Sequence, residues 1–462
     1  MSAQGLDEAR KKMADEGVEP LAIEVFAHYY RLLEHGETGM IPESTIEPLD
    51  MPALADVVVD ETQAIEALAA TAVIKLNGGL GTSMGMERAK SLLCVRRGLS
   101  FLDVIARQTL HLRRTHGVTL PLIFLNSFRT SADTRAALAR YEDLQVDGIP
   151  GELLQNKEPK LTSEELVPVS WPKDPELEWC PPGHADLYTA LVTSGLLDHL
   201  ISSGYRYAFC SNADNLGAVA DPRVAGWFAA SGAPFAIESV RRTPSDRKGG
   251  HFARRASDGR IILRESAQTL EEDKEALADL DRHKYTSTNN VWFDLQALRT
   301  ELDRRDGVLG LPLIRNVKTV DPTDPSSPEV IQIEAAMGAA IEVFEGAQTI
   351  EVGRDRFVPV KTTNDLLLLR SDSYDLRADF VLDQAAAELA YVDLSGSYKQ
   401  VAEFDKRFPE GVPSMIEAHS LVVDGDWTFG GDVSVVGDAH LTGDHGHVAP
   451  GTQLGSGPDA EA

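Results

Sequence analysis

Cysteine pairs and long apolar runs are missing from this sequence. Its three cysteines, Cys94, Cys180 and Cys210, are too few for a disulfide framework, and no CxxC pair offers the spacing for zinc or thiol exchange. No apolar stretch approaches the roughly 18 residues of a membrane-spanning helix, and the first residues lack the hydrophobic core of a signal peptide. We therefore expect a reduced, cytoplasmic protein with no membrane partner.

Positive charge is also scarce. Lys and Arg together number 44 against 72 Asp and Glu, so the formal net charge is −28. Nucleic acids and anionic membrane surfaces bind to positive fields, and we expect neither as a main partner. A small anionic ligand needs only a local cluster of donors and cations, so this net charge is compatible with one.

The patterns along the 462 residues predict three domains. Residues 1–70 carry apolar residues at spacings of three and four and are predicted to be helical, with loops at 44–48 and 51–52. Residues 71–370 alternate predicted strands, at 72–76, 120–125, 205–210, 235–240 and 290–293, with predicted helices at 91–93, 101–112 and 131–141. Residues 371–462 form a C-terminal domain. The alternation predicts an α/β fold with a mostly parallel sheet, whose ligands bind at the carboxyl ends of the strands.

A repeat with a period of six occupies about residues 415–455. Gly-Asp pairs recur in step, and one apolar residue per repeat keeps the same register: Val423, Phe429, Val435 and Leu441. Hexapeptide periodicity is typical of a β-helix, in which each six residues make one side of a coil. A run of hairpins with Gly-Asp turns is the alternative.

The first predicted strand runs into a glycine loop, Asn77-Gly78-Gly79-Leu80-Gly81-Thr82-Ser83-Met84-Gly85, which we expect to open a helix. Glycines let the backbone approach a ligand closely, and their N–H groups can bind phosphates or the edge of a base. The Walker lysine and the dinucleotide-binding glycine spacing are both absent. Lys90 follows the loop and is placed to fold back onto phosphates. The alternatives are a tight turn without a ligand and a solvated lysine.

Other polar residues cluster in turns at the ends of predicted elements. Pro181-Pro182-Gly183-His184-Ala185-Asp186 is a rigid turn that presents His184 to a polar substrate, with Asp186 as a helix cap. Asp214 ends a buried strand, where a carboxylate suits Mg²⁺. Asn289 and Asn290 carry amides that donate and accept, as the recognition of sugar hydroxyls requires. For each of these motifs a purely structural turn is the alternative.

In combination, these motifs closely resemble eukaryotic-type UDP-glucose pyrophosphorylases. The resemblance covers roughly residues 70–370 and runs in order through the glycine loop with Lys90-Ser91 and through residues 126–128, 181–184, 214–218, 248–250, 288–290 and 357–365. The terminal repeat is also similar to that family. The resemblance implies a glycosyltransferase-A-like (Rossmann-like) nucleotidyltransferase core, with an N-terminal helical region and a C-terminal left-handed β-helix.

The same resemblance implies a reaction and a set of site residues. UTP and glucose 1-phosphate would give UDP-glucose and pyrophosphate by in-line attack on the α-phosphorus, with Mg²⁺ as cofactor. Lys90 and Lys361 would be catalytic and Asp214 would hold the metal. The sugar would be read by His184, Glu265, Asn289 and Asn290. The nucleotide would contact Leu76, Asn77, Gly78, Gly79, Lys90, Gln155, Gly183, Asn212, Ala213, Asp214 and Lys361.

The chain departs from the family pattern in three places. Ala185 replaces a glycine, residues 86–89 (Met-Glu-Arg-Ala) replace a Cys-Lys-Gly-Pro-like stretch, and Ala213 replaces a larger apolar residue. The alternative functions are a pyrophosphorylase for an N-acetylhexosamine or galactose phosphate, a nucleotide-sugar-binding regulator without turnover, and a glycosyltransferase. We expect a monomer or a small homo-oligomer.

Overall fold

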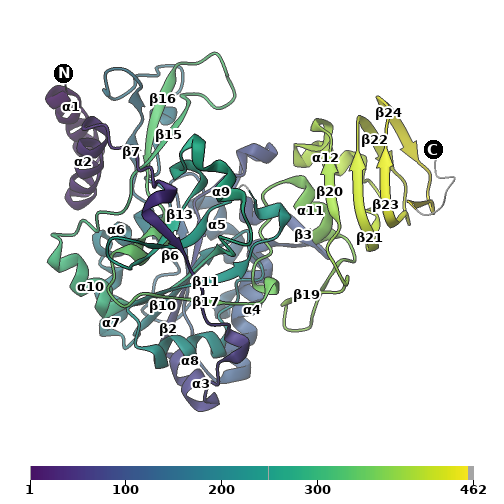
Figure 1. Ribbon diagram of the computed structural model, residues 1–462, viewed down its shortest axis with the longest axis horizontal. Helices are drawn as coiled ribbons and strands as arrows, with labels where there is room; N and C mark the ends of the chain where they lie inside the picture. Colours follow the sequence, from purple (N-terminus) through teal and green to yellow (C-terminus); the bar gives the residue numbers. More distant parts are fainter. Residues whose placement is uncertain (1, 248, 456–462) are drawn as a thin grey trace.

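The computed structural model describes residues 2–247 and 249–455, and it has a large α/β body with an elongated extension of stacked strands at one end (Figure 1). A seven-stranded sheet forms the centre of the body. Its strands, in spatial order, are β17 (Gln348–Glu351), β11 (Phe235–Arg241), β14 (Tyr285–Asp294), β10 (Tyr207–Asn212), β2 (Thr71–Asn77), β5 (Leu122–Asn126) and β6 (Glu152–Leu154). β14 is antiparallel to both of its neighbours, whereas the other neighbouring strands are parallel. The predicted α/β fold with a mostly parallel sheet is confirmed.

Each of the five predicted strands overlaps a strand of this sheet. β14 is longer than its prediction, because it starts at Tyr285 and contains an irregularity. The register with β11 jumps there: Glu238 pairs with Asn290, but Ser239 pairs with Ser287. Asn289, inside the irregularity, has a positive φ of 58°. A bulge of this kind re-aims a side chain, and here it turns Asn289 toward the end of β10.

The sheet buries both of its faces, because successive residues of β2 point to opposite sides. Val73 joins one hydrophobic cluster and Ile74 joins the other. The first cluster is covered by α3 (Glu61–Ala69), α4 (Phe101–His116) and α8 (Pro222–Ser231); the second is covered by α2 (Pro20–Glu34), α6 (Asp186–Thr193), α7 (Leu196–Ser202) and α10 (Leu295–Arg304). This three-layer arrangement leaves the ends of the strands as the place where a ligand can enter.

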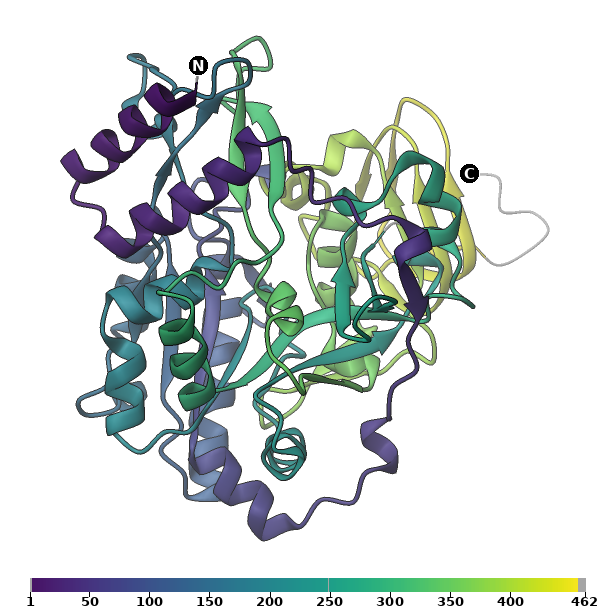
Figure 2. The ribbon, with the colours of Figure 1, turned by 60° about the vertical axis from the view of Figure 1, so that its left-hand side comes forward.

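The N-terminal 70 residues are only partly helical. α1 (Ser2–Asp15) and α2 pair with each other and lie beside the hairpin of β15 (Ile314–Thr319) and β16 (Glu329–Glu334), as Figure 2 shows. Between α2 and α3 the chain is largely extended, and β1 (Ile46–Pro48) adds to a small sheet with β12 (His251–Arg255) and β13 (Ile261–Arg264). The helical prediction is therefore correct for α1, α2 and α3, and the non-helical stretch between α2 and α3 contains the loops predicted at 44–48 and 51–52.

The glycine loop does not open a helix. Gly81 and Gly85 have positive φ values of 72° and 71°, and between them lies a single turn of 3₁₀ helix. A second short turn, Lys90–Leu92, replaces the predicted helix at 91–93, and a hairpin of β3 (Cys94–Arg96) and β4 (Leu99–Ser100) follows. The first α-helix after the glycine loop is α4, which Ser100 caps through a capping box with Asp103.

The C-terminal extension is a stack of parallel strands. β20 (Tyr391–Leu394), β21 (Ser414–Val423), β23 (Ser434–Leu441) and β25 (Gln453–Leu454) form one sheet, and β22 (Asp426–Phe429) pairs with β24 (His445–Val448). Val423 lies opposite Leu441, three hexads later, and the four apolar repeat residues are all buried. Parallel pairing excludes the hairpin alternative.

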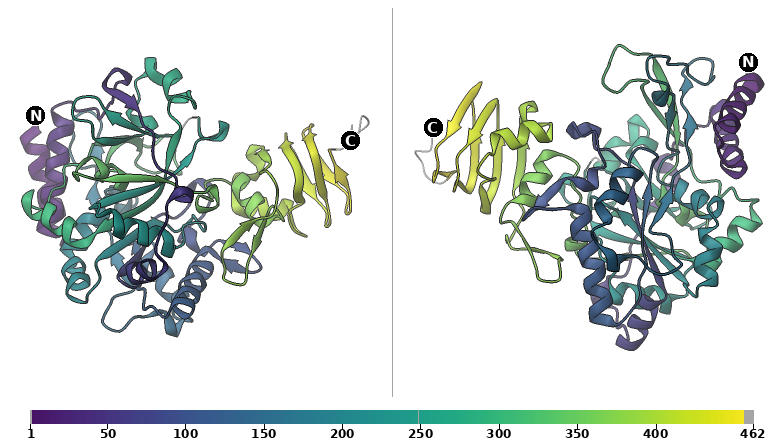
Figure 3. Two further views of the ribbon diagram at one scale, coloured as in Figure 1. Left: turned by 60° about the horizontal axis from the view of Figure 1, so that its bottom comes forward. Right: turned by 180° about the vertical axis from the view of Figure 1, so that it is seen from behind.

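This stack lies at the far end of the molecule from α1 and α2 (Figure 3). It is joined to the body through α11 (Thr363–Arg370), α12 (Val401–Arg407) and the pair β18 (Tyr374–Leu376) and β19 (Leu382–Gln384). Gln400, just before α12, packs against Gly85 of the glycine loop; a Cβ at Gly85 would lie 3.0 Å from Gln400 Cγ. Within the described residues, none of the helices combines the length and the apolar character required to cross a bilayer.

Candidate active site

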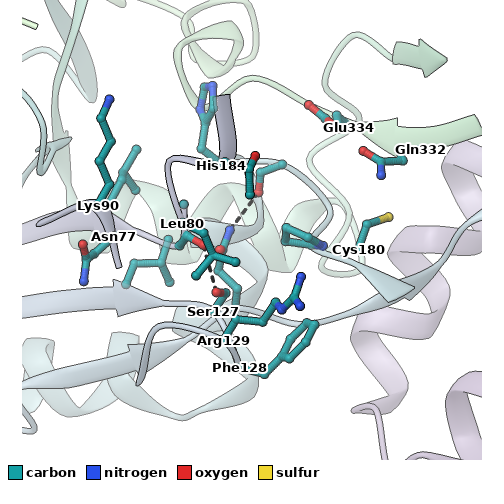
Figure 4. Close-up of a pocket in the computed structure, with 18 of the residues that line it drawn as sticks. Asn77, Leu80, Lys90, Ser127, Phe128, Arg129, Cys180, His184, Gln332 and Glu334 are labelled. Carbon is teal, nitrogen blue, oxygen red and sulfur yellow. Dashed lines mark hydrogen bonds between the residues drawn. The ribbon is translucent and has the colours of Figure 1, made fainter. Parts of the chain in front are cut away.

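A cavity of about 600 Å³ opens at the carboxyl ends of β2, β5 and β10. Register explains why it forms there: Leu76 pairs with Asn212 on one side and with Leu125 on the other, so the three strands end together. Eleven of the predicted site residues line the cavity: Leu76, Asn77, Gly78, Gly79, Lys90, Gln155, Gly183, His184, Asn212, Ala213 and Asp214. Figure 4 shows Lys90 on one side and Gln332 and Glu334, from β16, on the other.

Gln155 lies between two glycines on the cavity wall. Its Nε2 donates to the carbonyl oxygen of Gly183 over 3.1 Å, and a Cβ at Gly78 would lie 2.1 Å from its Oε1. Gly183 has a φ of +81°, and a Cβ there would lie 2.9 Å from Ala335 O. Gly183 therefore requires glycine, whereas a side chain at Gly78 would require the Gln155 amide to move; together the two glycines leave this amide beside two backbone segments that a planar base can approach.

The start of the glycine loop is held by buried polar contacts. Asn77 is 4% exposed, and its Nδ2 donates to Asn126 Oδ1 over 2.7 Å and to Thr134 Oγ1 over 2.9 Å. Ser127 Oγ donates to Gly78 O over 2.8 Å. The Nδ2 hydrogens of Asn77 are thus used in hydrogen bonds within the protein. Ser127, which had no predicted role, fixes the glycine loop.

Lys90 and Lys361 converge on Asp214. Lys90 Nζ lies 2.8 Å from Asp214 Oδ2 and also donates to Val360 O, while Lys361 Nζ lies 3.1 Å from the same carboxylate oxygen. The Lys90 side chain is 16% exposed and lines the cavity, whereas the Lys361 side chain is 58% exposed and reaches Asp214 without lining the cavity itself. Burial alone would raise the pKa of Asp214, but the charges and hydrogen bonds of the two lysines outweigh it and lower that pKa.

The Asp214 carboxylate fits one divalent cation. It is ionised, and Oδ1 has only a long contact to Lys361, 3.5 Å. Mg²⁺ commonly takes one or two carboxylates and completes its shell with phosphate oxygens and water. Among the described residues, the one three-residue cluster of metal-ligating groups, Glu43, His251 and His283, lies elsewhere, and Arg264 and Arg282 already bind its carboxylate.

His184 is a neutral hydrogen-bond donor in the cavity wall. Its Nδ1 accepts from the backbone N–H of Met337 over 2.9 Å, so the proton of the neutral ring lies on Nε2. Burial and the charge of Lys361 lower the pKa of His184 to about 4. The ring therefore stays neutral at physiological pH and offers a fixed N–H to a ligand oxygen.

The two adjacent asparagines of β14 have different environments. Asn289 Nδ2 donates to Asn212 Oδ1 over 2.9 Å, which places it against a cavity residue. Asn290 is fully buried, and its Nδ2 donates to Glu238 Oε2 over 3.1 Å. Neither residue lines the cavity itself, nor does Glu265, which lies beside Gly250 with its pKa raised by burial. Lys248, of the motif at 248–250, lies outside the described residues.

Asp186 does not cap α6. The cap residue is Ala185, and the Asp186 carboxylate instead accepts from Asn156 N over 2.6 Å and from Asn156 Nδ2 over 2.8 Å. Asn156 directly follows Gln155, so this pair ties the Gln155 segment to the turn that carries Gly183 and His184. Burial raises the pKa of Asp186 to about 6.

Several lining residues had no predicted role. Phe128 and Arg129 directly follow Ser127, and a signal for them exists because they continue the predicted motif at 126–128. Gln332 and Glu334 come from the β15–β16 hairpin, which no motif marks. The further lining residues without a prediction include Lys160, Trp179, Lys318 and Pro322.

Comparisons with known proteins identify the family of the chain. A family model described as UTP–glucose-1-phosphate uridylyltransferase matches residues 23–436. A probable UTP–glucose-1-phosphate uridylyltransferase from Schizosaccharomyces pombe is 37% identical over 370 residues, 79% of this chain and 72% of that protein. The Hordeum vulgare protein of that name is 36% identical, over 80% of this chain and 76% of its own length.

Solved structures are similar along almost the whole chain. A mutant UDP-glucose pyrophosphorylase from Leishmania major in complex with UDP-glucose has a TM-score of 0.92 and 40% identity, covering 98% of both chains. A UDP-glucose phosphorylase from Trypanosoma brucei has a TM-score of 0.91 and 41% identity, also covering 98% of both. The chain therefore belongs to the UTP–glucose-1-phosphate uridylyltransferase family.

Proposed function

We propose that this chain transfers the uridylyl group of UTP to glucose 1-phosphate, forming UDP-glucose and releasing pyrophosphate. The observation that carries the proposal is the convergence of Lys90 and Lys361 on Asp214, which lines the same cavity as Gln155. A base site and a cationic phosphate site in one cavity suit a nucleoside triphosphate. Family membership supplies the identity of the nucleotide and the sugar.

The base of UTP would lie against the Gly78 backbone and the Gln155 amide. An amide donates and accepts at once, which matches the imide edge of uracil. The nearby Gly78 and Gly183 backbones are fixed by Ser127 and Gln155. A site whose polar groups would be left unpaired by another base discriminates strongly against it.

The phosphates would lie between Lys90 and Lys361. Transfer needs little covalent work from the protein, because the sugar phosphate oxygen attacks the α-phosphorus in line as pyrophosphate leaves. Lys90 and Lys361 would hold the charge that develops on the leaving group, and a bound Mg²⁺, held by Asp214 and phosphate oxygens, would neutralise the triphosphate. The net charge of −28 makes these local cations necessary.

Sugar recognition would use the donors beside the phosphate site. We assign the hydroxyl contacts to His184 Nε2 and Asn289, because His184 is a fixed neutral donor and Asn289 is bonded to Asn212 at the cavity wall. Glu265 is a further candidate through its partly buried carboxyl group. Asn290 is bonded within the protein core, and we propose a different role for it below.

The finer description of the fold is also a proposal. The strand order and the crossover connections support a glycosyltransferase-A-like nucleotidyltransferase core over residues 71–370. The parallel pairing of residues three hexads apart supports a left-handed β-helix at about 415–455, within a C-terminal domain of residues 371–462. Residues 1–70 would be a separate, partly helical region.

The test is pyrophosphate release with each nucleoside triphosphate and sugar 1-phosphate in turn, across a series of Mg²⁺ concentrations. We expect release with UTP and glucose 1-phosphate and little with CTP. Faster release with an N-acetylhexosamine or galactose phosphate would identify a related pyrophosphorylase with another sugar. Binding of UDP-glucose without any release, in folded protein, would overturn the proposal in favour of a regulator.

A further inference from the structure

Asp214 and Lys361 are far apart in the chain but share one backbone junction. The two residues are 147 positions apart. The backbone N–H of Val360 donates to Asp214 O over 3.2 Å, and Asn215 forms an isolated antiparallel bridge with Pro359. A Cβ at Gly217 would lie 2.2 Å from Asp355 O, so the two segments are in direct backbone contact.

The side chain of Asn215 fills the junction with four hydrogen bonds. Its Oδ1 accepts from Gly217 N over 3.2 Å and from Val358 N over 2.9 Å. Its Nδ2 donates to Arg356 O over 3.1 Å and to Asn290 Oδ1 over 3.4 Å. An amide has two donor hydrogens and two acceptor lone pairs, so every one of them is used. The residue is 1% exposed and does not line the cavity.

A buried ion pair between Glu238 and Arg356 fixes two of the residues that Asn215 binds, Arg356 and Asn290. Glu238 is fully buried and accepts from Arg356 Nε over 2.6 Å and from Arg356 Nη2 over 2.7 Å. The same carboxylate accepts from Trp292 Nε1 over 2.9 Å and from Asn290 Nδ2 over 3.1 Å. Bidentate Arg–carboxylate pairs of this kind hold a strict geometry. The Asn215 loop and the Arg356 segment are therefore both anchored to β11 and β14 of the central sheet.

We propose that Asn215 is a positioning residue: it sets the distance between the Asp214 carboxylate and the Lys361 ammonium, and Asn290 serves the same network instead of touching the sugar. This inference rests on the proposed function of the two charged groups. Asn215 fixes its own loop through Gly217 and the opposite segment through Arg356 and Val358. No other residue type of this size supplies two donors and two acceptors at such a site.

Loss of Asn215 should affect turnover more than UTP affinity, because different residues carry the two. UTP binding would draw on Gly78, Gln155 and Lys90, none of which Asn215 contacts, so the Michaelis constant for UTP changes little. Lys361 acts on charge that develops during transfer, and a misplacement of about 1 Å commonly costs on the order of 100-fold in rate. Asn215→Ala should therefore lower turnover about 10-fold or more with a Michaelis constant for UTP within about twofold of wild type.

The experiment compares the intact wild-type chain with Asn215→Ala and Asn215→Asp. The aspartate keeps the shape and both acceptor contacts but loses the donations to Arg356 O and Asn290. Thr71→Val is the matched control, because it removes the buried bond from Thr71 Oγ1 to Ala67 O, at the opposite end of β2 from the cavity. Thermal melting should show a comparable loss of stability in the control, whose turnover should stay at the wild-type value.

A double-mutant cycle separates positioning from a general loss of stability. If Asn215 acts through Lys361, its removal should cost much less turnover in a Lys361→Ala background than in the wild-type background. Equal costs in both backgrounds, or wild-type turnover in a folded Asn215 variant, would overturn the inference. Should Asn215→Ala not fold, Asn215→Asp decides by the same cycle. Absence of pyrophosphate release by the wild-type chain would instead refute the proposed function.

Discussion

Gly78 faces the Gln155 amide so closely that a Cβ added to Gly78 would lie 2.1 Å from Gln155 Oε1 and 3.2 Å from its Cδ. Gln155 is held on its other side by Gly183, to whose carbonyl oxygen its Nε2 donates. The amide therefore has no room to withdraw without losing that bond. Gly78 and Gln155 act as a pair, with the glycine setting the position of the glutamine.

Gly78→Ala should weaken UTP binding and relax the choice of base, because the new methyl group displaces the Gln155 amide. We expect the Michaelis constant for UTP to rise about 10-fold and the preference for UTP over CTP to fall, as in Gln155→Ala. The measurement is steady-state pyrophosphate release with each nucleotide. In a Gln155→Ala background the added methyl group has no amide to displace, so a full additional loss there would contradict the pairing.

Lys361→Ala and Lys90→Ala should lower turnover more than they raise the Michaelis constant for UTP. Both ammonium groups would stabilise charge on the leaving pyrophosphate, and removal of one such group commonly costs on the order of 100-fold in turnover. Lys399→Ala, an exposed lysine outside the cavity, is the control. The mechanism would be wrong if folded variants of both site lysines kept turnover near the wild-type value.

Asp214→Asn should shift the Mg²⁺ dependence of turnover to higher concentration, because a carboxylate ligand is lost. The same change removes the shared negative charge between Lys90 and Lys361, so the two ammonium groups should repel each other and the variant should melt at a lower temperature. Activity across a Mg²⁺ series checks the first effect, and thermal melting checks the second. An unchanged Mg²⁺ dependence in folded protein would remove Asp214 from the metal site.

Acid should destabilise the fold through His251. The residue is fully buried and its ring stacks on His283 with a centroid separation of 3.7 Å. Burial and the nearby charges lower the pKa of His251 to about 3. The unfolded chain binds this proton near the ordinary value of 6.5, so stability is complete above pH 6.5 and is lost as the pH falls below it.

The size of this effect can be measured by urea unfolding. Between about pH 7.5 and about pH 5.5, His251 should account for a loss of about 1.4 kcal/mol in the free energy of unfolding. His251→Gln should unfold with a correspondingly smaller difference between the two pH values, whatever its stability at neutral pH. The exposed His419→Gln is the control. An identical pH difference in His251→Gln and wild type would contradict the prediction.

A chain that ends near residue 412 should keep some turnover while losing solubility or stability. None of the described residues beyond 412 lines the cavity, and Gln400, which packs on the glycine loop, is retained. The cut exposes the aromatic side of α12, because Phe408 stacks on Phe429 with a centroid separation of 4.8 Å and Tyr398 donates to Trp427 O. Loss of all turnover in a well-folded, soluble truncation would give the stack a role in catalysis.

The sequence was sufficient for five of the seven strands of the central sheet and for eleven of the residues that line the cavity. Runs such as 122–125 are buried on both faces, so their apolar character is continuous, and polar residues that end such strands must meet at one edge of the sheet. That reasoning brings Asn77, Asn212 and Asp214 together. The glycine loop misled the helix prediction, because two positive φ values turn the chain before any helix can start.

The sequence does not show which of two adjacent side chains faces the site, because that depends on irregularities in the strands. Asn289 and Asn290 are adjacent, and side chains of adjacent strand residues point to opposite faces, so an irregularity in register decides which one meets the site. No local pattern reveals that irregularity. Gln332 and Glu334 reach the cavity from a hairpin that has no ligand-binding motif of its own, so only the three-dimensional fold associates them with it.

The contact between Gly85 and Gln400 joins a part of the site that is synthesised early to a residue that is synthesised late. A ribosome releases the glycine loop, the Gln155 segment and Asp214 long before it releases Lys361 and, later still, Gln400. Domains begin to fold as they emerge, so a nascent chain would possess the wall that holds the base, and Lys90, while it still lacked Lys361 and the Gln400 side chain that packs on the loop. The enzyme would thus gain its ability to hold a nucleotide before its ability to transform one, and premature termination between the end of β17 and Lys361 would release a binder without turnover.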